Sequence, residues 1–118
     1  MTAERKRGRL ARAYSASGMP RLHVALQEGF ANDTVSVRVN GTEVARLTNV
    51  TTRNQIGFAD AIDLDVPSGR LELELRIETR AIVEDTSMHV AGTTYVGVTV
   101  ARDGRVVCEQ THEPFRYL

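Results

Sequence analysis

The chain has 118 residues, the usual size of one domain, which suffices for a hydrophobic core but not for two domains. Its 15 basic and 15 acidic residues cancel, so overall charge does not drive it toward nucleic acid or an anionic membrane. A single cysteine excludes an internal disulfide, and no apolar stretch resembles a secretory signal or a membrane span. These features predict a soluble, cytoplasmic protein with no membrane span.

The first 20 residues differ from the rest in composition. They hold one acid, Glu4, against five basic residues, Arg5, Lys6, Arg7, Arg9 and Arg12. Few apolar side chains and a Ser/Gly/Pro-rich end predict a flexible basic tail over residues 1–20 and a folded domain over residues 21–118. The composition also fits an organelle transit peptide. Nucleic-acid binding is not expected, because five basic residues without an aromatic platform give only weak, non-specific contacts with phosphate.

Beyond the tail, apolar and polar residues alternate with a period of two. Residues 22–26 and 35–39 predict two strands that each bury one face. The dipeptide Asn40-Gly41 predicts a tight hairpin after the second of them, since both residues tolerate positive φ. The predicted cross-strand partners are Val37 with Val44 and Arg38 with Glu43.

The remaining chain continues in the same pattern. A polar loop over residues 48–54 is long enough to cross between sheets. Asp103-Gly104 predicts a second tight hairpin, and residues 79–86 form a looser stretch. Further strands are predicted over residues 55–60, 62–66, 71–77, 88–90, 96–100 and 106–111. About eight strands without a helix after residue 20 predict an all-β fold, a single antiparallel β-sandwich of immunoglobulin-like, prealbumin-like or jelly-roll-like type. This resemblance is architectural and implies no function.

Three asparagines begin glycosylation sequons: Asn32, Asn40 and Asn49. Their neighbours have the composition of turns and strand ends. We interpret them as turn and cap residues.

An acidic ladder is predicted beside the turn at residues 67–70. A hairpin there would set Val66 opposite Leu71, and the same register opposes acidic side chains, Asp65 against Glu72 and Asp63 against Glu74. Opposed carboxylates destabilise a sheet, so a nearby arginine, a cation or a basic partner must compensate. The candidate arginines are Arg76, Arg80 and Arg46.

The basic tail is one such partner. Arg5, Arg7 and Arg9 carry charge opposite to the ladder, so the tail could dock on its own domain or on a neighbouring subunit. Salt should weaken this docking, because it depends on exposed charges.

The one thiol, Cys108, shares a strand face with His112, but four strand residues separate them by about 13 Å. This exceeds the distance at which a nucleophile and base interact. The hairpin at Asp103-Gly104 sets Cys108 opposite Thr99. We interpret Cys108 as a packing residue.

A metal site would require His23, His89 and His112 to converge, because no two of them stand at ligand spacing. Nucleotide-binding, hydrolase and zincin motifs are absent from the sequence, so no cofactor is expected. Carbohydrate binding is not expected either, since the chain has no tryptophan.

The last residues are unusually apolar for a chain end. Pro114 has no amide donor and should stop strand pairing near His112. Phe115, Tyr117 and Leu118 should therefore either plug the open end of the sandwich or dock on another chain.

The favoured hypothesis is a non-enzymatic binding or assembly module that uses a sheet edge, end loops or tails. Its partner would be another protein or a second copy of the chain, because open sandwiches must manage exposed edges. One alternative is a small metal- or ligand-binding enzyme with a site of strand-separated His, Asp and Glu. Another is a ligand-binding sandwich with a pocket beside residues 48–58.

Overall fold

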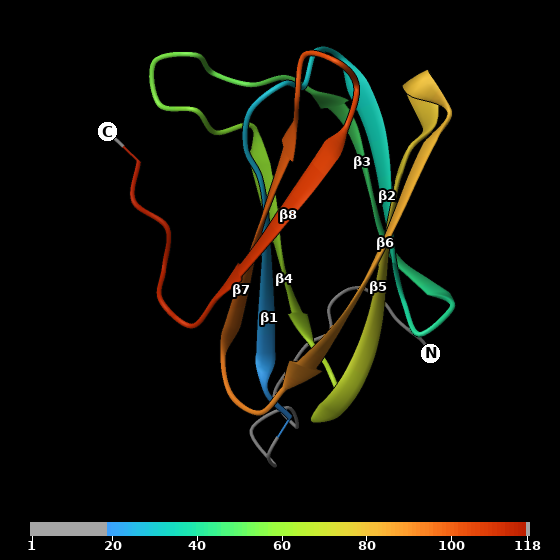
Figure 1. The fold of residues 1–118 in the computed structure, drawn as a ribbon, viewed down its shortest axis with the longest axis vertical. Helices are drawn as coiled ribbons and strands as arrows, with labels where there is room; N and C mark the ends of the chain where they lie inside the picture. Colours follow the sequence, from blue (N-terminus) through green and yellow to red (C-terminus); the bar gives the residue numbers. More distant parts are fainter. Residues whose placement is uncertain (1–18, 118) are drawn as a thin grey trace.

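The computed structural model describes residues 19–117 as two four-stranded sheets that pack face to face (Figure 1). Sheet A has the strand order β4-β1-β7-β8, and sheet B has the order β3-β2-β5-β6. The predicted tail, with Arg5, Arg7 and Arg9, lies outside the described residues up to position 18, and Leu118 does so too. The elements are β1 (Arg21–Leu26), β2 (Asp33–Val39), β3 (Thr42–Val50), β4 (Asp60–Asp65), β5 (Gly69–Ile77), the 3₁₀ helix η2 (Glu78–Arg80), β6 (Ile82–Val90), β7 (Thr94–Val100) and β8 (Val106–Thr111).

The predicted all-β sandwich is confirmed, and the strand order refines its type. Every neighbouring pair of strands is antiparallel except β1 and β7, which are parallel at the centre of sheet A. An immunoglobulin domain places its first two strands side by side in one sheet. Here β1 and β2 belong to different sheets, so the strand order differs from that of an immunoglobulin domain.

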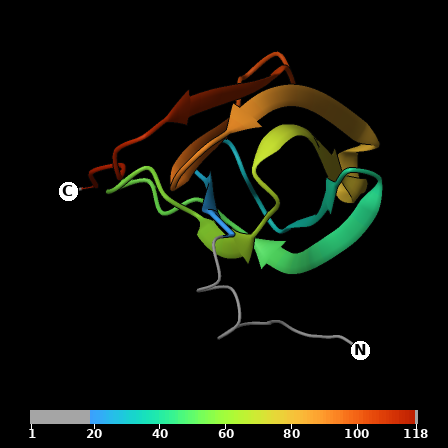
Figure 2. The ribbon, with the colours of Figure 1, turned by 90° about the horizontal axis from the view of Figure 1, so that it is seen from below.

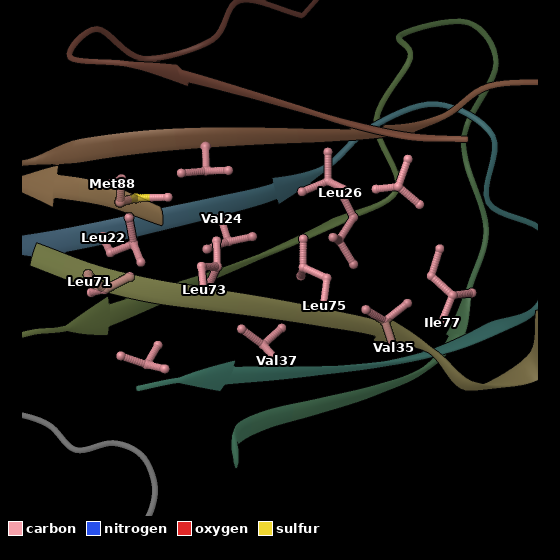
Figure 3. Close-up of a cluster of buried hydrophobic side chains, with 14 of the residues drawn as sticks. Leu22, Val24, Leu26, Val35, Val37, Leu71, Leu73, Leu75, Ile77 and Met88 are labelled. Atoms are coloured by element: carbon pink, nitrogen blue, oxygen red, sulfur yellow. The ribbon is translucent and has the colours of Figure 1, made fainter. Parts of the chain in front are cut away.

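The core fills the space between the sheets with the side chains that the period-two pattern predicted. Leu22, Val24 and Leu26 of β1 face Leu73 and Leu75 of β5 across the sandwich (Figure 3). Because successive strand residues point to opposite faces, each of these strands presents a polar residue outward between two buried ones. The view from below shows both sheets curving around the space between them (Figure 2).

The β2–β3 hairpin confirms one predicted pair and corrects the other. Arg38 lies opposite Glu43, as expected, but Val37 lies opposite Ala45 and not Val44. The register shifts between these two pairs, so Val44 is an extra residue in β3 and its side chain is 42% exposed.

The β7–β8 hairpin is one residue longer than predicted. Ala101 donates its N–H to Arg105 O at 2.8 Å, and Gly104 takes φ +88°, which gives a three-residue turn. Cys108 consequently lies opposite Val98 and not Thr99. A shift of one residue exchanges the two faces of a strand, so Cys108 points toward the core while Val107 is 45% exposed on the outer face.

The three sequon asparagines occupy one backbone conformation. Asn32, Asn40 and Asn49 have φ values of +51°, +50° and +56°. Asparagine is enriched in this left-handed region because its short polar side chain tolerates it. Asn32 and Asn40 lie in turns, in agreement with their interpretation, whereas Asn49 lies within β3, one residue before its end.

Candidate functional site at the β8 edge and the C-terminal segment

The predicted acidic ladder is wrong. β4 pairs with β1 in sheet A, whereas β5 pairs with β2 and β6 in sheet B. The chain therefore crosses between the sheets at residues 66–68 and forms no hairpin there. Val66 is buried in the core, which agrees with its predicted place on the apolar face although its predicted partner Leu71 is wrong.

The two aspartates predicted for the ladder instead lie opposite basic residues of β1. Asp63 Oδ1 lies 2.8 Å from Nδ1 of His23, and Asp65 lies opposite Arg21. Both placements follow from the pairing of β4 with β1, so neither Asp63 nor Asp65 lies opposite Glu72 or Glu74.

In sheet B, Glu72 binds Ser87 and Arg70, and its pKa is lowered first by the Ser87 hydrogen bond and then by that of Arg70. Glu74 lies opposite Asp85, which leaves one like-charge pair on this face. An ion pair with Arg76, one of the predicted arginines, compensates it.

The three histidines do not converge. His23 lies on the outer face of sheet A beside Tyr95, with ring centroids 5.5 Å apart. His89 lies on β6 in the opposite sheet, and His112 follows the end of β8. Between residues 19 and 117, no three His, Cys, Asp or Glu side chains are grouped so that they could hold a metal ion.

Cys108 is poorly suited to nucleophilic chemistry. Burial, followed by the nearby negative charge of Glu84, raises the pKa of its thiol to about 11. The thiol is therefore protonated at neutral pH, and thiolate is the reactive form.

The C-terminal segment folds back onto its own domain. Phe115 packs edge-on against Tyr95 with ring centroids 6.5 Å apart. The ring centroids of Tyr117 and Phe58 are 4.9 Å apart. The Nε2 group of Gln27 donates a hydrogen bond to the Tyr117 hydroxyl at 3.0 Å. The segment thus runs along the outer side of sheet A toward the β3–β4 loop (Figures 1 and 2). It does not enter the core between the sheets, where the plug was expected.

A hollow of about 280 Å³ lies where this segment meets the β3–β4 loop. The sequence predicted a strand at residues 55–60, but residues 54–57 form a turn closed by a bridge between Arg53 and Phe58. Thr52 anchors the loop, because its hydroxyl donates to Gln27 O at 2.6 Å and accepts from Phe30 N at 3.0 Å. The hollow is lined by Glu28, Thr52, Asn54, Gln55, Ile56, Gly57, Arg116 and Tyr117.

Three of the four sheet edges carry features that discourage pairing with another chain. β3 is interrupted by two register shifts, and β4 holds three aspartates in six residues. On β6, Glu84 lies opposite the buried Leu75, so this charge is on the inner face of an edge strand. Inward charges, bulges and short charged strands are known protections of sheet edges.

The β8 edge has none of these features among the residues that the structure describes. All six residues of VVCEQT pair with β7 without a register shift, and Glu109 is the only charged one. The inner positions hold Val106 and the half-buried Cys108. β8 is therefore the least protected edge of the described domain.

No known family model matches the chain, and no curated protein matches it significantly. No helix within residues 19–117 is long and apolar enough to cross a membrane. The candidate sites therefore depend on geometry alone.

Sequence reasoning missed both the β8 edge and the partners of the C-terminal segment. Edge status depends on strand order, which a period-two pattern does not contain. The contacts of Gln27 and Phe58 with Tyr117 join distant parts of the chain, and no local motif marks them.

Proposed function

We propose that the protein is a non-enzymatic assembly module that pairs through the free edge of β8. The observation that carries this proposal is the contrast between β8 and the three protected edges. An unprotected strand presents a row of unpaired N–H and C=O groups to another chain. The proposed partner is a second copy of the same domain.

The hydrogen-bond pattern identifies the groups that would pair. Ala101 N–H bonds to Arg105 O, so Arg105 belongs to a hydrogen-bonded pair of the β7–β8 hairpin. Bonded and non-bonded pairs alternate along an antiparallel ladder. The N–H groups of Val106, Cys108 and Gln110 consequently face away from β7, toward the free edge.

Charge favours one register of self-pairing. An antiparallel dimer centred on Cys108 places Val106 opposite Gln110 and uses all three outward N–H groups. The same register sets Glu109 opposite Val107 and not opposite its own copy, which avoids like-charge repulsion. Val107 would then cover part of its exposed apolar surface.

The metal- or ligand-binding enzyme alternative has less support. The described histidines lie far apart in the fold, and the thiol of Cys108 is held protonated. Pairing through the β8 edge needs no catalytic group, because it uses backbone N–H and C=O groups.

The test compares two substitutions at Gln110 in the full chain by size-exclusion chromatography with light scattering. Gln110→Pro removes an outward N–H that would bond to the second copy, so it should convert the dimer to a monomer. The domain itself should stay folded, because its β7–β8 ladder does not use that donor. Gln110→Ala keeps the N–H and should remain dimeric. A monomeric unsubstituted chain across all concentrations, or a dimer that survives Gln110→Pro, contradicts the proposal.

A further inference from the structure

The hollow beside the C-terminal segment has the features of a binding site that is independent of the β8 edge. Its volume of about 280 Å³ lies just below the range typical of small-ligand pockets. The β3–β4 loop forms one wall and residues Arg116 and Tyr117 form another, so both walls come from segments outside the two sheets.

Both walls are held in place by contacts within the domain. The Tyr117 ring packs on Phe58, and its hydroxyl accepts the hydrogen bond from Gln27. On the opposite wall, Ile56 and Gly57 donate backbone hydrogen bonds to Arg53 O at 3.1 and 2.9 Å. A site with anchored walls loses little conformational entropy when a ligand binds.

Two opposite charges line this hollow without pairing with each other. Glu28 and Arg116 are not within 4.0 Å, although other oppositely charged neighbours in the domain form ion pairs, such as Arg46 with Glu78 at 2.5 Å. The Glu28 carboxylate lies against Gly57, where an added Cβ would come within 3.2 Å of its Oε2 atom. Gly57 has φ +67°, so the loop conformation itself disfavours a side chain that would displace the carboxylate.

The other lining groups suit the rest of a small amphoteric molecule. The amides of Asn54 and Gln55 supply both donors and acceptors, whereas Ile56 and the Tyr117 ring offer apolar contact. We propose that the hollow binds a small zwitterion of the α-amino-acid class, with its ammonium group at Glu28 and its carboxylate at Arg116. Its apolar side chain would lie between Ile56 and Tyr117.

The experiment uses L-leucine and two blocked derivatives as probes for the full chain, followed by ¹H–¹⁵N NMR. N-acetyl-L-leucine lacks the ammonium group, and L-leucinamide lacks the carboxylate. L-leucine should shift the amide resonances of Asn54, Gln55 and Gly57. Each derivative should bind about two- to fivefold more weakly, because the charges are exposed and such pairs contribute modestly.

Substitutions assign each charge to its partner. Glu28→Gln should bind L-leucine and N-acetyl-L-leucine equally, and Arg116→Gln should do so for L-leucine and L-leucinamide. Glu43→Gln and Arg102→Gln make the same charge changes elsewhere on the surface. These two control variants should still bind L-leucine more tightly than either blocked derivative.

Two outcomes would overturn the inference: no shift at these amides with L-leucine at about 50 mM, or equal affinity of all three probes for the unsubstituted chain. Because the hollow is lined by no β8 residue, Gln110→Pro should not change leucine binding. The leucine-binding experiment therefore tests the hollow even if the chain proves to be a monomer.

Discussion

Replacing Asp33 by alanine should destabilise the domain strongly. The Asp33 side chain is only 3% exposed and forms an ion pair with Arg80, whose Nη2 lies 2.7 Å from Oδ2. Its carboxylate also accepts hydrogen bonds from the Thr79 hydroxyl at 2.5 Å and from Ala31 N at 2.9 Å. These contacts join the start of β2 to η2, which leads into β6.

The magnitude follows from what the substitution leaves behind. Removing one partner of a buried ion pair costs about 3–5 kcal/mol. The remaining partner, Arg80, has a side chain that is 31% exposed, so water can partly solvate its charge. We therefore expect a loss of about 3 kcal/mol in the free energy of unfolding. For a domain of this size the melting temperature should fall by on the order of 10 °C.

The pH dependence provides a second readout. Burial alone would raise the pKa of Asp33, but its hydrogen bonds, foremost that of Arg80, outweigh burial and lower it. A lowered carboxyl pKa contributes stability that is present above the unfolded value of about 4 and is lost as the pH falls through the folded value. The difference between the native chain and Asp33→Ala should therefore shrink below about pH 4.

Urea unfolding from pH 3 to pH 7 measures both effects. Glu72→Gln is the matched control, because this carboxylate also pairs with an arginine but is about half exposed. It should leave the unfolding midpoint nearly unchanged. If Asp33→Ala unfolds at the same urea concentration as the control, the buried ion pair does not stabilise the fold as argued.

Three further predictions concern single residues. Gly29→Ala should cost at least about 2 kcal/mol more than Gly41→Ala in thermal unfolding, because both positions have positive φ but only at Gly29 would a Cβ lie 2.0 Å from Val100 O; equal losses would contradict the contact. At pH 8, Cys108 should react with a disulfide reagent about 100-fold more slowly in the native than in the urea-unfolded chain, since its pKa of about 11 replaces an ordinary value near 9; equal rates would refute the raised pKa. Tyr117→Phe should lower the free energy of unfolding by about 1 kcal/mol through the lost hydrogen bond, and an unchanged urea midpoint would argue against that bond in solution.

The sequence predicted the strands and their buried faces well because the period of two is a local property. The alternation at residues 22–26 and 71–77 marked the inner faces correctly, and those side chains form the centre of the core. The polar composition of residues 48–54 also indicated a crossing between the sheets, and β3 of sheet B does lead there to β4 of sheet A.

Pairing was harder to predict, since it depends on turn length and strand order. Asp103-Gly104 signals a tight turn equally well for two or three residues, and that single residue decides whether Cys108 faces Thr99 or Val98. The segment after Val66 has the composition of a hairpin turn but crosses to the other sheet. This crossing separates Asp63 from Glu74 and removes the predicted ladder.

Hydrogen exchange at the outward amides of β8 tests the assembly proposal most directly. In a dimer paired through this edge, the N–H groups of Cys108 and Gln110 are bonded to the second copy and should exchange slowly. Their protection should rise with protein concentration, whereas Val107 and Glu109 are bonded within the hairpin and should be protected at every concentration. Rapid exchange of Cys108 and Gln110 at high concentration, beside protected Val107 and Glu109, would contradict the proposal.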